Sequence, residues 1–235
     1  GTPMRVHAAP RTSATTMALR LAAMLVVATM LLAGVVGGLM RAGAVVPWAA
    51  EAAWPGLAVK SHAFLMICAF MGTVIGLERA VALKERPAFA APVCSAAAGA
   101  LTLSGLSQAA EALIVLASVG FLAVNLAVVA RQRAAHTALL LTGAGAWFVG
   151  NLLHALGAPG PAVIPWWFAF LVLTISAERL EMTRLMRRRP GASAMLYACL
   201  GCTLVGAAAS GLSPTWGTGL YGLSLVALAC WLVCF

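Results

Sequence analysis

The basic residues of this chain gather at alternate gaps between its long apolar segments, and this spacing restricts the chain to one class of protein. All but two of the 15 Lys and Arg residues lie before the first apolar segment or at every second gap after it. Arg41 and Lys60 are the two exceptions. Cytoplasmic loops of membrane proteins keep Lys and Arg, whereas translocated loops lose them. The pattern therefore predicts a multi-pass membrane protein with a cytoplasmic N-terminus and a cytoplasmic C-terminus.

Eight apolar segments of about 20 residues are long enough to cross the hydrocarbon core of a bilayer as helices. They cover residues 21–40, 61–83, 89–106, 110–130, 137–156, 163–185, 194–212 and 216–235. The expected fold is an all-α polytopic transmembrane bundle of eight spans. The expected domains are a cytoplasmic tail over 1–20 and a transmembrane domain over 21–235.

The composition excludes other classes of protein. The chain is 63% hydrophobic and only 9% charged, which lies far outside the range of a soluble globular domain. The net charge of +9 is the inside-facing fringe of a membrane protein and indicates a lipid partner, not a nucleic acid. We expect the inner (cytoplasmic) membrane and no cleavable signal peptide. The last segment ends without a polar flank, as in a fragment of a longer protein.

Tryptophan clusters at the predicted exterior side of the membrane. The longest exterior loop, 41–60, contains Trp48 and Trp54, and the sixth and eighth spans begin with Trp166, Trp167 and Trp216. Tryptophan is enriched at membrane interfaces, where its ring is anchored at the level of the headgroups. We therefore expect these residues to form an aromatic belt.

An internal repeat is visible when the chain is shifted by 100 residues. The shift places the second predicted span on the sixth, with matches at Ala69/Ala169, Phe70/Phe170, Ile75/Ile175, Glu78/Glu178 and Arg79/Arg179. Because four spans separate the two copies, both have the same orientation. This predicts a 4+4 parallel repeat, with halves at about 21–133 and 134–235.

The repeated Glu-Arg pairs lie near the cytoplasmic ends of their spans, where ionisable side chains usually face a partner inside the bundle. The pseudo-symmetry predicts crossed pairing of Glu78 with Arg179 and of Glu178 with Arg79. Glu181 with Arg184 extends this structural network. The alternative is a proton or ion route, but a base beside each acid favours the structural interpretation.

Two of the four histidines are placed where they could hold a cofactor. His7 and His136 are expected to be solvated, whereas His62 and His154 lie at the exterior ends of the second and fifth spans. An α-helical wheel puts Met66, Ala69, Thr73 and Gly76 on the face of His62, and Trp147, Gly150 and Asn151 near His154. Two imidazoles could ligate haem, and His with Met could hold copper. The alternative is that each histidine only forms hydrogen bonds.

Other chemistry is weakly indicated. Cys199, Cys202, Cys230 and Cys234 are spaced so that two neighbouring helices could form a soft-metal site, but small apolar packing is the favoured role. The sequence contains no Asp, which argues against a carboxylate-based ion pump. We assign no catalytic residue and leave open whether the protein is an enzyme.

The segment His62-Ala-Phe-Leu-Met-Ile-Cys-Ala-Phe-Met-Gly-Thr-Val-Ile-Gly, together with Gly150-Asn-Leu-Leu-His154, resembles the NnrS-like membrane proteins. The resemblance implies that His62, Met66, Asn151 and His154 occupy motif positions and bind haem or copper. It also implies a link to nitric-oxide stress and a chain longer than this one. Lys60-Ser61 stands where that family often has a further histidine.

A second hypothesis comes from another functional class. The spans are dominated by Ala, Gly and Leu and contain few polar groups, which suits close helix packing. On this interpretation the chain is a non-catalytic accessory subunit of a larger membrane complex, or half of a transporter. It would bind lipid, pigment or neighbouring subunits.

Overall fold

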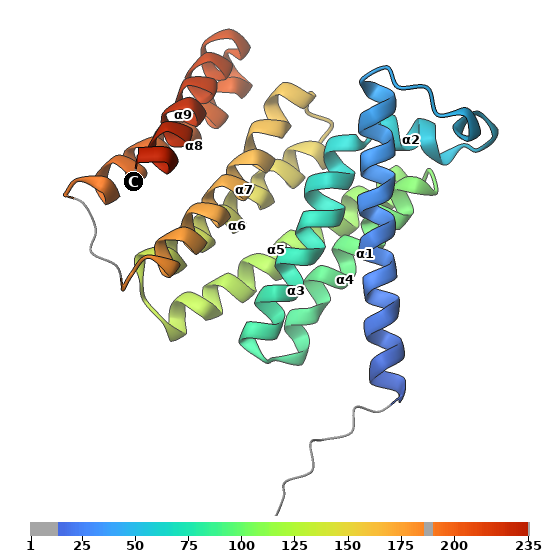
Figure 1. The fold of residues 1–235 in the computed structure, drawn as a ribbon, viewed down its shortest axis with the longest axis horizontal. Helices are drawn as coiled ribbons and strands as arrows, with labels where there is room; N and C mark the ends of the chain where they lie inside the picture. Colours follow the sequence, from blue (N-terminus) through green and yellow to red (C-terminus); the bar gives the residue numbers. More distant parts are fainter. Residues whose placement is uncertain (1–13, 186–189, 235) are drawn as a thin grey trace, which may run out of the picture.

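A computed structural model describes residues 14–185 and 190–234, and this part of the chain is helical without any strand (Figure 1). The α-helices are α1 (Ala14–Arg41), α2 (Trp54–Lys60), α3 (Gly72–Leu83), α4 (Ala90–Leu103), α5 (Ser107–Arg131), α6 (Ala135–Ala155), α7 (Gly160–Met182), α8 (Ala192–Leu212) and α9 (Pro214–Cys234). Two 3-10 helices, η1 (Pro47–Glu51) and η3 (Arg86–Phe89), and one π-helix, η2 (Phe64–Met71), complete the order. Residues 1–13 of the predicted tail and residues 186–189, with Arg5, His7, Arg11 and Arg187 to Arg189, lie outside the described residues, whereas residues 14–20 already belong to α1.

Seven helical segments of the described chain are long and apolar enough to cross a membrane. They are α1 from Arg20, the continuous helix η2–α3, and α5 to α9. The predicted third span is the one that differs. Its helix, α4, has 14 residues and rises about 21 Å, less than the hydrocarbon thickness of about 30 Å. The structure confirms a polytopic helical bundle, and the eighth span stays a prediction.

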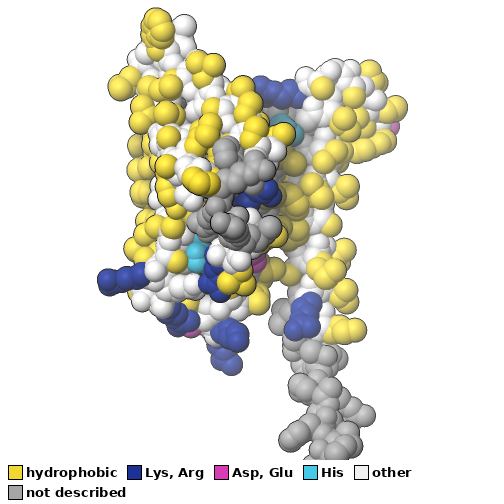
Figure 2. Space-filling view, turned by 60° about the vertical axis from the view of Figure 1, so that its left-hand side comes forward, with side chains coloured by type: hydrophobic (Ala, Val, Ile, Leu, Met, Phe, Trp, Pro, Cys, Tyr) yellow, Lys and Arg dark blue, Asp and Glu magenta, His cyan; other side chains and the backbone are white. Residues whose placement is uncertain are grey.

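Consecutive helices pack side by side as hairpins. Figure 1 shows α8 and α9 at one edge of the molecule and α1 at the other, with α6 and α7 beside α8 and α9. The short helix α2 lies near the end of α1. Figure 2 shows a broad belt of hydrophobic side chains, with many of the Lys and Arg side chains toward one end. This distribution is the one expected of a bundle surrounded by lipid.

The largest core cluster joins η2, α3, α4, α5, α6 and α7. Trp147 stacks on Phe170 with ring centroids 5.2 Å apart, and Phe121 meets both rings edge-on. Trp167 belongs to the same cluster and is only 3% exposed, so its predicted place in an aromatic belt is wrong. Its position on α7 turns it toward α6, whereas Trp216 is 82% exposed.

The two copies of the predicted repeat differ in local form. The second span begins with the π-helix η2, whereas α7 is a regular α-helix that contains Pro165. The parallel repeat therefore stays a prediction.

Candidate functional site

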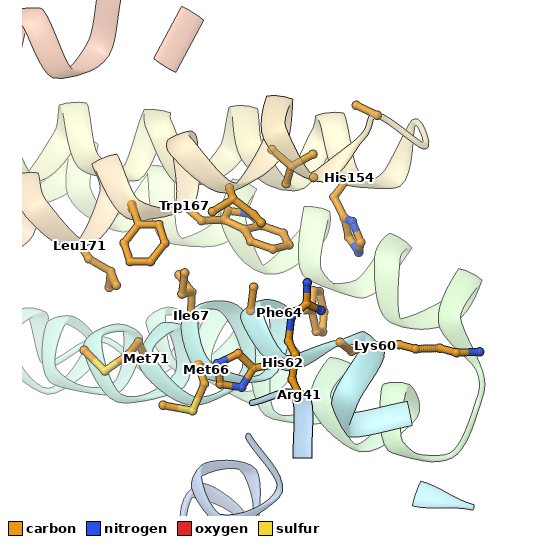
Figure 3. A pocket seen from close by; sticks show the side chains of 17 residues that line it. Arg41, Lys60, His62, Phe64, Met66, Ile67, Met71, His154, Trp167 and Leu171 are labelled. Atoms are coloured by element: carbon orange, nitrogen blue, oxygen red, sulfur yellow. The ribbon is translucent and has the colours of Figure 1, made fainter. Parts of the chain in front are cut away.

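A pocket of about 720 Å³ lies at the end of the bundle where α1, α2 and α6 end and α7 begins (Figure 3). We call it the histidine pocket. The residues that line it are Arg41, Lys60, Ser61, His62, Ala63, Phe64, Met66, Ile67, Met71, His154, Ala158, Gly160, Val163, Ile164, Trp167, Phe168 and Leu171. They include two cations, two imidazoles and two thioethers, and among the described residues no acid lines the pocket.

One wall of the histidine pocket is formed by the π-helix η2, which contributes Phe64, Met66, Ile67 and Met71. A π-helix has i→i+5 hydrogen bonds and is frequent at functional sites. Its wider turn changes which residues share a face. Met66 lines the pocket, whereas Ala69 does not line it and is fully buried in a cluster with Met30 and Ala33 of α1.

The ring of His62 is held against α1 by a hydrogen bond. Its Nδ1 lies 2.7 Å from the carbonyl oxygen of Gly34. A carbonyl oxygen only accepts, so Nδ1 donates, and in the neutral ring the lone pair is on Nε2. Gly38 provides the space for the ring, because a Cβ there would lie 2.6 Å from His62 Cε1. This arrangement is typical of metal-ligating histidines, whose other nitrogen is fixed by a backbone carbonyl or carboxylate.

Met66 is a neighbour of His62 on the same wall. A Cβ on Gly34 would lie 2.5 Å from Met66 Sδ, so the thioether packs against the same stretch of α1 as the imidazole. Both side chains line the histidine pocket. An imidazole and a thioether are a donor pair suited to copper.

His154 enters the histidine pocket from the α6 wall. Its ring centroid lies 5.5 Å from that of Phe64 and 5.2 Å from that of Trp167. Figure 3 shows His62 and His154 on opposite walls. Both histidines line the histidine pocket, and aromatic rings pack around His154.

Asn151 lies behind the wall of the pocket and does not line it. It is fully buried, and its Oδ1 accepts hydrogen bonds from Trp167 Nε1 at 2.9 Å and from Cys68 Sγ at 3.3 Å. The structure thus gives Asn151 a positioning role, because it fixes the indole that forms the pocket wall. Direct contact with a cofactor, as the family resemblance implies, is not what this geometry provides.

The Glu-Arg residues lie at the opposite end of the bundle. Arg79 is 8% exposed and pairs with Glu178 of α7, while Glu78 Oε1 lies 3.6 Å from Arg79 Nη2. Within the described chain no ion pair joins Glu78 to Arg179, so one half of the crossed pairing is present and the other is not. The charges of Glu78 and Glu178 both act on the one buried guanidinium.

His136 also belongs to this end, and the expectation that it is solvated is wrong. It is 7% exposed in the first turn of α6, and its Nε2 lies 3.9 Å from Glu181 Oε1. Glu181 therefore faces His136, a partner that the spacing to Arg184 did not indicate.

The cysteines do not form a metal cluster in the part of the chain that the structure describes. Cys199 is buried, whereas Cys202, Cys230 and Cys234 are exposed. The role of these cysteines as small apolar residues stays a prediction.

Several residues of the histidine pocket were not predicted as site residues. The sequence could have indicated Arg41 and Lys60, because they are the two basic residues outside the alternate gaps that hold the other Lys and Arg residues. It could not have indicated Phe64 and Trp167, because their inward direction depends on the π-helix and on the packing of α6 against α7.

The helices and the histidine pocket define a multi-pass helical membrane protein with an imidazole-containing pocket at one end of its bundle. The chain belongs to the family described as "Domain of unknown function (DUF8744)", which matches residues 20–235. No curated protein and no solved structure matches the chain.

Proposed function

We propose that the histidine pocket is a cofactor site and that the protein is an NnrS-like membrane protein that binds haem or copper through His62. The observation that carries the proposal is the hydrogen bond from His62 Nδ1 to the Gly34 carbonyl, which leaves Nε2 as a lone-pair donor beside a pocket. His154 in the same lining adds a second imidazole.

The residues present fit such a group. The volume of the pocket is within the range of small-molecule sites, about 300 to 1,000 Å³. Its apolar wall suits a flat organic cofactor, and Met66 beside His62 suits copper. Haem or copper would supply one-electron chemistry and the binding of a small gas such as nitric oxide. The chain would hold the metal through His62, keep the imidazole oriented through Gly34, and shield the pocket with Trp167.

Met66→Leu separates the two candidate cofactors. Thioether sulfur is a ligand for Cu(I), and Leu keeps the shape of the side chain. We expect Met66→Leu to weaken Cu(I) binding by at least about tenfold, equivalent to about 1.4 kcal/mol, and to leave haem binding unchanged. The measurement is a titration of the purified protein with haem, followed by absorbance, and with Cu(I), followed by competition with a chromogenic chelator.

Each arm of this titration has a clear meaning. Wild-type protein that binds Cu(I), with weaker binding in Met66→Leu, assigns copper. Wild-type protein that binds haem and not Cu(I), with unchanged haem binding in Met66→Leu, assigns haem. A protein that binds neither at micromolar concentration contradicts the proposal and favours the accessory-subunit alternative. Cys202→Ser, at an exposed position on α8, is the control for nonspecific copper binding.

The same proposal includes a topology. We propose eight membrane crossings with both chain ends in the cytoplasm, supported by the charge bias of the sequence. Single cysteines at Gly105 and Gly157, in a background without native cysteines, should react with a membrane-impermeant maleimide in intact cells. Cysteine at Arg133 should react only after the cells are opened. The reverse pattern would invert the topology and place the histidine pocket at the cytoplasmic face.

A further inference from the structure

The two basic residues that break the charge bias of the sequence meet at the histidine pocket. Arg41 is the last residue of α1 and Lys60 the last residue of α2. Both line the pocket, and both are exposed. On the proposed topology both residues lie on the exterior side, where Lys and Arg are normally depleted. Two cations at one pocket on that side therefore suggest a role in the pocket itself.

Within the described chain, neither cation has a protein anion as partner. No ion pair involves Arg41 or Lys60, and no acid lines the pocket. At the other end of the bundle the pattern differs, because Arg79 pairs with Glu178 and Arg131 with Glu85. The charges of Arg41 and Lys60 are thus available to a ligand.

The histidine pocket changes from polar to apolar along its length. Figure 3 shows Lys60 and His154 toward one end and Met71 and Leu171 at the other. Ile67, Phe168 and Leu171 continue the apolar part. A pocket with cations at one end and hydrocarbon at the other is complementary to a molecule with an acidic head and an apolar body.

We infer that the histidine pocket binds a carboxylate-bearing amphiphile, with its acidic group at Arg41 and Lys60 and its apolar body against Trp167, Phe168 and Leu171. This inference rests on the proposed function for the place of the site but not for the metal. Two molecules share this chemistry: haem, which has carboxylate side chains on a flat apolar ring, and a long-chain fatty acid.

The test uses the full chain in nanodiscs of zwitterionic phosphatidylcholine. The probe is a photoactivatable long-chain fatty acid, and its adducts are located by peptide mass spectrometry. We expect adducts on residues 160–171 of α7, competition by oleate, and no competition by oleyl alcohol. The double substitution Arg41→Gln/Lys60→Gln should reduce labelling by at least about tenfold, since charge-assisted hydrogen bonds are lost. Arg133→Gln, an exposed base at the other end, is the matched control.

A second arm measures haem affinity of the same variants by absorbance. If only fatty-acid labelling falls, the ligand is a lipid acid. If only haem affinity falls, the two cations bind the carboxylates of haem. Either result supports the inference. Labelling and haem affinity that both stay unchanged in Arg41→Gln/Lys60→Gln overturn it. His62→Ala distinguishes a failure of the proposed metal site from a failure of this inference, because it should remove metal binding while fatty-acid labelling persists.

Discussion

Glu178→Gln is expected to destabilise the folded protein by about 3 kcal/mol, because it leaves a buried guanidinium without its main partner. The side chain of Arg79 is 9% exposed, whereas that of Glu178 is 37% exposed. Removal of the acid therefore leaves the more deeply buried charge, and Arg79→Gln should cost less than Glu178→Gln. The measurement is the free energy of unfolding in mixed detergent micelles, titrated with SDS.

The double substitution Arg79→Gln/Glu178→Gln decides whether this pair acts as a unit. We expect it to be more stable than Glu178→Gln alone, because it removes both charges together. Glu78→Gln is the matched control: its side chain is 56% exposed, so the expected loss is at most about 1 kcal/mol. Losses that simply add in the double variant would show that Arg79 and Glu178 are not coupled, and would leave the acids free for a role in conduction.

His62→Ala is expected to abolish cofactor retention, with a loss of at least about 100-fold in affinity, equivalent to about 2.7 kcal/mol. The reason is that the hydrogen bond to Gly34 occupies Nδ1 of His62 and leaves Nε2 free to ligate a metal. His154→Ala should reduce cofactor affinity less than His62→Ala if the metal has one imidazole ligand. It should reduce that affinity as much as His62→Ala if the metal has two. The measurement is metal and haem content of protein purified from membranes, per mole of chain.

His136→Ala provides the control for this comparison. His136 is buried near Glu181 at the other end of the bundle, so its loss should leave cofactor content unchanged. Equal cofactor loss in His62→Ala and His136→Ala would mean that histidine removal acts through general misfolding. A normal cofactor content in His62→Ala would remove this residue from the site.

The sequence was sufficient to predict a helical membrane bundle, because segment length and charge bias act on each helix separately. The sequence also predicted that His62 and His154 lie at the same end of the bundle, because the direction of each span follows from the number of spans before it. The repeat alignment paired Arg79 with Glu178, as the structure does. It also predicted a pair of Glu78 with Arg179, whereas in the described chain Glu78 lies beside Arg79 of its own helix.

The interior of the histidine pocket depended on features that no pattern in the sequence reveals. The π-helix changes the angular spacing after His62, and no hydrophobic pattern in the sequence indicates it. The place of the His62 ring depends on Gly38 of a different helix. Asn151 resembled a ligand by its motif position, whereas its contact with Trp167 exists only once α6 and α7 are packed.

The central claim, that His62 ligates a metal in the histidine pocket, is tested most directly by X-ray absorption at the edge of the metal that the purified protein carries. We predict imidazole scattering around the metal in the wild-type protein, and its loss or reduction by one imidazole in His62→Ala reconstituted with the same metal. An identical scattering pattern in wild type and His62→Ala would contradict the claim.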